Sequence, residues 1–132
     1  MALLIDTSVL IAVERKEAPT PPGEFDGESA SISAITASEL LHGVERATDE
    51  ARRARRQAFV ERVLDTLPVL PFDLDVARVH ARVWARLSGR GEAIGAHDLI
   101  IAATALSRDL VVLTRNTREF TRVEGLVVRG FE

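Results

Sequence analysis

Three acidic residues, Asp6, Glu39 and Asp98, stand at positions where a carboxylate could take part in chemistry. Asp6 directly follows the apolar run at residues 2–5, which suits a strand buried on both faces of a parallel sheet. Glu39 lies in the first turn of the helix predicted after a second strand, and Asp98 opens the most apolar helix of the chain. Because open α/β sheets bind ligands at the carboxyl ends of their strands, the three acids are expected at one edge of a sheet.

Each of these acids also has a purely structural explanation. Asp6 or Ser8 could cap the helix that follows them. The sequence Thr36-Ala-Ser-Glu39 fits a capping box, in which the Glu39 side chain bonds back to the Thr36 amide. Asp98 lies at a helix N-terminus, where the helix dipole favours an anion. Taken singly, each acid is explained by helix capping as well as by a site.

Taken together, the three acids are harder to explain by capping. Asp6 and Asp98 lead into apolar segments, and neither has a lysine or arginine at pairing distance along its own element. Burial of unpaired carboxylates costs free energy, and two carboxylates about 5 Å apart repel by roughly 3–4 kcal/mol at an effective dielectric of about 20. A divalent cation removes that repulsion, and oxygen ligands favour Mg²⁺ or Mn²⁺. Such a cation binds phosphate and lowers the pKa of its bound water, which is the chemistry of phosphodiester hydrolysis.

The elements that must position these acids alternate along the chain. The apolar pattern predicts strands at residues 2–5, 29–33, 68–72, 110–113 and 126–128, and helices at 9–13, 37–47, 50–66, 76–87 and 98–106. A Pro/Gly loop is predicted at residues 18–27, and a short helical turn closes at Phe120. This alternation favours an α/β fold with three α/β/α layers around a mostly parallel sheet, whose edges are the third and fifth strands. Residues 1–132 are predicted to form a single domain.

Composition narrows the class of protein. Of the 132 residues, 46% are hydrophobic and 28% are charged, as in an ordinary globular protein. The chain has no cysteine, which excludes disulfides and thiolate metal sites. The net charge of −3 argues against a protein that coats nucleic acid, but it does not exclude a nuclease with bound cations. The apolar runs indicate neither a signal peptide nor a membrane span, so a cytoplasmic location is expected.

Four segments of the chain carry a family resemblance. They are Leu-Ile-Asp-Thr-Ser at residues 4–8, Ile-Thr-Ala-Ser-Glu-Leu at 35–40 with Gly43, Ala-His-Asp-Leu-Ile-Ile-Ala-Ala at 96–103, and Val-Leu-Thr-Arg-Asn-Thr-Arg-Glu-Phe at 112–120. In this order they resemble the PIN-domain VapC toxins of type II toxin–antitoxin pairs. The resemblance covers essentially the whole chain and does not depend on any single motif.

The resemblance implies a five-stranded parallel sheet and a Mg²⁺-dependent endoribonuclease, with Mn²⁺ able to replace Mg²⁺. By position, Asp6 and Asp98 match the metal-binding aspartates of the family, and Glu39 matches a third acid that binds metal or orients the attacking water. Asn116 stands at a fourth catalytic position that is often aspartate in the wider PIN group, which leaves a second metal open. Glu119 could supply the missing charge, although a solvated turn residue is the simpler interpretation.

The resemblance also implies partners. A VapB-like antitoxin would wrap this chain with its C-terminal segment and place a basic residue in the acidic pocket. A homodimer and a toxin–antitoxin hetero-oligomer are expected, with promoter DNA bound only through the antitoxin and with no membrane contact. A PIN-like binding or regulatory module without nuclease activity stays open as the alternative, because Asn116 replaces an acid.

Hydroxyl, basic and imidazole side chains carry weaker signals. Thr7, Ser8 and Thr114 could tune the site through hydroxyl contacts. Histidines 42, 80 and 97 lack ligand spacing and are expected to pack or to lie on the surface, although His97 could touch substrate. Five arginines of one helix could guide RNA through phosphate contacts, or could form a solvated face: Arg52, Arg53, Arg55, Arg56 and Arg62.

Overall fold

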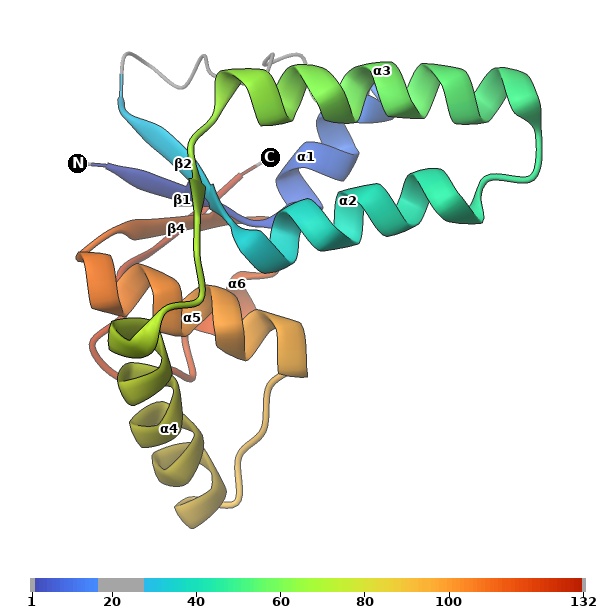
Figure 1. The fold of residues 1–132 in the computed structure, drawn as a ribbon. Coiled ribbons are helices and arrows are strands. Elements are labelled where there is room, and N and C mark those ends of the chain that lie inside the picture. The colour runs from blue at the N-terminus through green and yellow to red at the C-terminus, as the bar shows by residue number, and fades with distance from the viewer. Residues whose placement is uncertain (1, 17–27, 132) are drawn as a thin grey trace.

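A computed structural model describes residues 2–16 and 28–131 (Figure 1). The loop predicted at residues 18–27 lies outside the described residues. The described elements are β1 (Leu3–Ile5), α1 (Thr7–Glu14), β2 (Ala30–Ser33), α2 (Ala34–Arg46), α3 (Glu50–Thr66), β3 (Val69–Leu70), α4 (Leu74–Gly89), α5 (Ala96–Arg108), β4 (Val111–Thr114), α6 (Thr117–Phe120) and β5 (Val128–Gly130).

The five described strands form one sheet in the order β3-β2-β1-β4-β5, and every pair is parallel. β1 occupies the centre, where Leu3 pairs with Ala30 of β2 on one side and with Val111 of β4 on the other. β3 and β5 lie at the edges, as predicted. The predicted α/β class and parallel sheet are therefore confirmed.

Helices cover both faces of the sheet (Figure 1). Leu3 and Ile5 of β1 pack with α1, α2 and α3 on one face, whereas Leu4 between them packs with α4 and α5 on the other. This alternation follows from the two-residue period of a strand, and it requires both faces of the central strand to be apolar. None of the described helices is long and apolar enough to span a membrane.

The start of α2 differs from the prediction and changes the position of Glu39. The helix begins at Ala34 because Ser33 is the N-cap, and the Ser33 hydroxyl accepts a hydrogen bond from the Thr36 amide at 3.3 Å. Glu39 therefore lies in the second turn rather than the first. The predicted capping box between Thr36 and Glu39 is wrong, since Ser33 already fills the capping position.

Other boundaries shift by a few residues. α1 begins at Thr7, two residues earlier than predicted. α5 begins at Ala96, so Asp98 lies inside its first turn rather than at its start. α5 ends at Arg108, after which Asp109 adopts the left-handed conformation with φ of 56°. β5 covers Val128–Gly130 instead of residues 126–128. These shifts leave the element order unchanged.

Candidate active site

Asp6 is buried at the carboxyl end of β1, with 4% of its surface exposed. Its Oδ2 accepts hydrogen bonds from the Ser8 and Thr114 hydroxyls, each at 2.7 Å. Asp6 occupies the N-cap position of α1, yet its side chain forms no capping bond to the helix. The capping explanation of Asp6 is therefore wrong, and two hydroxyl donors instead fix this carboxylate between β1 and β4.

Glu39 reaches the same edge of the sheet from α2. Thr7 donates a hydrogen bond from Oγ1 to Glu39 Oε1 at 2.6 Å and lies 3.0 Å from Thr36 Oγ1. The other carboxylate oxygen, Oε2, lies 3.1 Å from His97 Nδ1. About a third of the Glu39 side chain, 32%, stays exposed. Glu39 is therefore held in place at both oxygens and still faces solvent.

Asp98 enters the cluster from the first turn of α5. The pKa of Asp98 is raised to about 7, first by burial, then by a hydrogen bond with Glu119 and by the negative charges of Asp6, Glu119 and Glu39. The same hydrogen bond with Asp98 lowers the pKa of Glu119. Asp98 and Glu119 are thus hydrogen-bonded to each other, and the charges of Asp6 and Glu39 act on Asp98.

Glu119 therefore adjoins this carboxylate cluster from α6, although it stays partly exposed to solvent. Besides Asp98, it contacts Asn116, whose Nδ2 donates a hydrogen bond to Glu119 Oε2 at 3.0 Å. A backbone hydrogen bond from Gly95 and the charge of Arg122 also act on Glu119. The i, i+3 spacing of Asn116 and Glu119 is visible in the sequence and is compatible with their hydrogen bond. The other partner of Glu119, Asp98 on α5, is distant along the chain, so the sequence does not indicate that contact.

Asn116 lies beside the carboxylate cluster and orients Glu119. Its backbone amide donates to Thr114 Oγ1 at 2.8 Å, and that hydroxyl in turn donates to Asp6 Oδ2. Since the Asn116 side chain donates to Glu119, this residue links Asp6 on one side to Glu119 on the other.

The donor chemistry of the cluster fits a hard divalent cation. Its candidate ligands are carboxylate oxygens, and the negative charges of Asp6, Glu119 and Glu39 add to burial and to the Glu119 hydrogen bond in raising the pKa of Asp98. Within residues 2–16 and 28–131, no three Asp, Glu or His side chains converge closely enough to form a complete cation site as they stand.

The five arginines of α3 do not form one solvated face, because some of them bond to backbone carbonyls of neighbouring segments. Arg53 donates to the Ala47 carbonyl at 2.5 Å, Arg56 donates to the Gly43 carbonyl at 2.8 Å, and Arg62 lies 5.8 Å from the Phe59 ring centre. Arg53 and Arg56 therefore join α3 to its surroundings, whereas Arg62 contacts a ring of its own helix. Arg52, Arg55 and Arg62 are exposed.

The histidines also separate by role. His80 packs edge-on between Phe72 and Trp84, with ring centres 5.5 and 5.7 Å away, and His42 is exposed, as predicted for packing and surface histidines. His97 differs, because it contacts the carboxylate of Glu39.

Known proteins match this chain in sequence and in fold. The chain matches the PIN domain family over residues 3–126. Ribonuclease VapC1 of Rickettsia felis is 40% identical to it over 128 residues, which cover 97% of this chain and 95% of the relative. This chain belongs to the VapC family of PIN-domain proteins. The tRNA(fMet)-specific endonuclease VapC of Shigella flexneri is 30% identical over 96% of this chain and 95% of its own length.

Solved structures agree with the VapC assignment. VapBC-5 of Mycobacterium tuberculosis, a member of the VapBC family of toxin–antitoxin systems, matches with a TM-score of 0.78 and 34% identity over 99% of this chain and 98% of that one. DNA-bound VapBC of Salmonella typhimurium matches with a TM-score of 0.84 and 28% identity over 98% of both chains. The predicted PIN-like fold is confirmed.

Proposed function

We propose that this VapC-family chain is a divalent-cation-dependent endoribonuclease and the toxin of a type II toxin–antitoxin pair. The observation that carries the proposal is the grouping of four carboxylates from four parts of the chain, in which Asp6, Glu39 and Glu119 lie near enough to Asp98 for their charges to act on it. RNA as the substrate is supported by the ribonuclease and tRNA endonuclease names of its relatives.

Asp6 and Asp98 would hold the cation, with Glu39 as a third ligand or as the group that orients the attacking water. A bound Mg²⁺ or Mn²⁺ supplies charge for the substrate phosphate and lowers the pKa of its water. The hydroxyls of Ser8 and Thr114 keep Asp6 oriented, and Thr7 does the same for Glu39. Asn116 would keep Glu119 in place beside Asp98 through the hydrogen bond from its side-chain amide.

Partners are also part of the proposal. The VapBC structures similar to this chain contain an antitoxin, and one of them is bound to DNA. We therefore propose that a VapB-like antitoxin blocks the carboxylates of this chain, that the toxin forms a homodimer, and that DNA is reached only through the antitoxin.

Cleavage of RNA by the purified chain tests the proposal. With Mg²⁺ or Mn²⁺ the chain should cut RNA, and Asp6→Asn or Asp98→Asn should lower the rate by at least about 10²-fold, the lower end of the range for a catalytic group. Asp65→Asn is the matched control, because Asp65 is exposed on α3. Cutting that persists in excess EDTA would contradict the metal mechanism. A chain that binds no Mn²⁺ and cuts no RNA would instead be a binding module.

A further inference from the structure

A charged groove lies between α1, α2 and α3 and shares Glu39 with the candidate active site. The groove has a volume of about 90 Å³. Along α2 it is lined by Glu39, Gly43 and Arg46, whose i, i+4, i+7 spacing places them on one helix face. Seven residues of helix span about 10 Å. The groove therefore leads from the carboxylate site outward along α2 to Arg46.

Three arginines line this groove, and two of them are available to a ligand. Arg56 belongs to the wall, since its Nη1 donates to the Gly43 carbonyl at 2.8 Å and its Nε lies 3.5 Å from Glu14 Oε2. Arg15 and Arg46 are exposed. Neither forms a salt bridge with another residue of the described ranges, 2–16 and 28–131. Glu14 is compensated by Arg56, so the outer part of the groove carries two uncompensated positive charges.

Gly43 keeps the groove open. Glycine in a helix interior is less favourable than alanine, yet α2 has a glycine here. A Cβ atom at position 43 would lie 3.7 Å from Arg56 Cδ, an ordinary contact, so packing does not require glycine. The missing side chain instead leaves space between the carboxylate site and Arg46.

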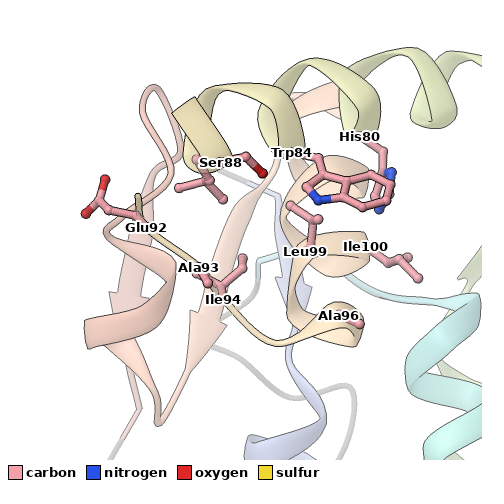
Figure 2. A pocket seen from close by; sticks show the side chains of 10 residues that line it. His80, Trp84, Ser88, Glu92, Ala93, Ile94, Ala96, Leu99 and Ile100 are labelled. Atoms are coloured by element: carbon pink, nitrogen blue, oxygen red, sulfur yellow. The ribbon is translucent and has the colours of Figure 1, made fainter. Parts of the chain in front are cut away.

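The larger hollow of the molecule, on the opposite face of the sheet, has a different chemistry. It has a volume of about 400 Å³ and lies between α4, α5 and their connection, with Trp84, Leu87, Ile94 and Leu99 in its lining (Figure 2). Glu92 is the charged residue among those that Figure 2 labels around it. A polyanion therefore fits the groove beside α2 and not this apolar hollow.

We infer that the groove binds the RNA strand at a phosphate neighbouring the scissile one, with Arg15 and Arg46 as the phosphate-binding residues. This inference rests on the proposed ribonuclease function. Guanidinium groups bind phosphate oxygens through paired hydrogen bonds. Phosphate contacts of this kind set the register of the strand without reading its bases. The groove thus places the strand so that the next phosphate lies at the carboxylates.

Steady-state cleavage of RNA at several KCl concentrations tests this inference, with RNA binding measured in parallel by the anisotropy of a labelled oligonucleotide. The Arg15→Gln/Arg46→Gln double variant should raise KM by about tenfold and leave kcat within about twofold, because phosphate contacts act on positioning. The salt slope, which is the slope of log affinity against log KCl concentration, should become shallower by about 0.7, since each neutralised phosphate of a single strand contributes about 0.7. The matched control is Arg78→Gln/Arg82→Gln, which removes two exposed arginines of α4.

A second variant, Gly43→Leu, fills the groove without changing charge and should also raise KM, with thermal unfolding as the check on folding. Unchanged KM and salt slope in the double variant, relative to the control, would overturn the inference while leaving the ribonuclease intact. If KM and the salt slope are unchanged but the double variant no longer binds an antitoxin, the groove is a protein-docking surface, and the inference is overturned as well. If the parent chain neither cuts nor binds RNA, the proposed function fails and the inference fails with it.

Discussion

At the scale of single residues, the site depends on hydroxyl groups that orient the carboxylates. Thr114 is fully buried, and its Oγ1 donates to Asp6 Oδ2 while it accepts from the Asn116 amide. The positions of Asp6 and Asp98 could be predicted, because Asp6 follows a buried strand and Asp98 lies in the first turn of an apolar helix. The position of Glu119 could not, because its partner Asp98 lies on a different helix and only the folded chain brings the two together.

Replacement of Thr114 by valine tests the orienting role of this hydroxyl. Thr114→Val keeps the shape and removes both hydrogen bonds, so we expect a loss of about 1–3 kcal/mol in the free energy of unfolding. We also expect a fall of about 10–100-fold in Mn²⁺ affinity, as for other partners of metal ligands. Titration calorimetry measures the affinity. Thr104→Val is the control, because buried Thr104 donates only to a carbonyl of its own helix, and an equal loss of affinity there would contradict the orienting role.

The raised pKa of Asp98 predicts a pH dependence of stability in the metal-free protein. Its pKa is about 7 in the folded chain against an ordinary 3.8, so the folded state binds the proton more tightly than the unfolded state. Stability should therefore fall as pH rises from about 5 to 7. The pKa of Glu119 is lowered from 4.5, so Glu119 titrates below this window.

The measurement is Tm against pH in EDTA for the parent chain and for Asp98→Asn. As pH rises from 5 to 7, the Tm of the parent chain should fall relative to the Tm of Asp98→Asn. A difference that stays constant across that window would show that Asp98 carries no raised pKa.

At the scale of elements, the connection between α4 and α5 is tied to the segment after α6. Arg122 Nη1 donates to the Ala93 carbonyl at 2.6 Å, and Arg90 Nη2 donates to the Arg122 carbonyl at 2.8 Å. Two residues after Ala93, Gly95 is the N-cap of α5, and its backbone forms a hydrogen bond with Glu119. Arg122 therefore helps to set the position of α5 relative to α6, which is the position of Asp98 relative to Glu119.

Arg122→Gln should weaken cation binding more than it weakens the fold. We expect about tenfold lower Mn²⁺ affinity, at the lower end of the range for residues that act through a ligand, with less than about 1 kcal/mol lost in the free energy of unfolding because these contacts are exposed. Arg118→Gln on α6 is the control, since Arg118 is exposed. If both variants bind Mn²⁺ alike, Arg122 does not position the site.

Element order was predictable because apolar periodicity alone separates strands from helices in this chain. The first and last residues of each element were harder to predict. α2 could be started from Thr36 or from Ser33, and both are hydroxyl residues that cap helices. The choice of Ser33 is made by the sheet, because Ser33 ends β2 and pairs in register with Leu70 of β3. Such a tertiary constraint has no local signal.

At the scale of the whole molecule, parallel order around β1 brings the four acids to one edge. β1 and β4 are neighbours, so Asp6 and Thr114 meet, and α2 and α5 begin near the same edge. The same order leaves two hollows of opposite character on the two faces of the sheet, one charged and one apolar. Their side-chain make-up could not be foreseen, because each is lined by residues from elements that are separated along the chain.

The central proposal is that Asp6, Glu39 and Asp98 hold one divalent cation together. An anomalous difference map from a crystal of the chain grown with Mn²⁺ tests it most directly. We predict a peak between the carboxylates of Asp6 and Asp98, with Glu39 bound to it directly or through water, and no such peak in Asp98→Asn crystals. A map of the parent chain with no peak at these carboxylates, at a Mn²⁺ concentration that supports RNA cleavage, would contradict the proposal.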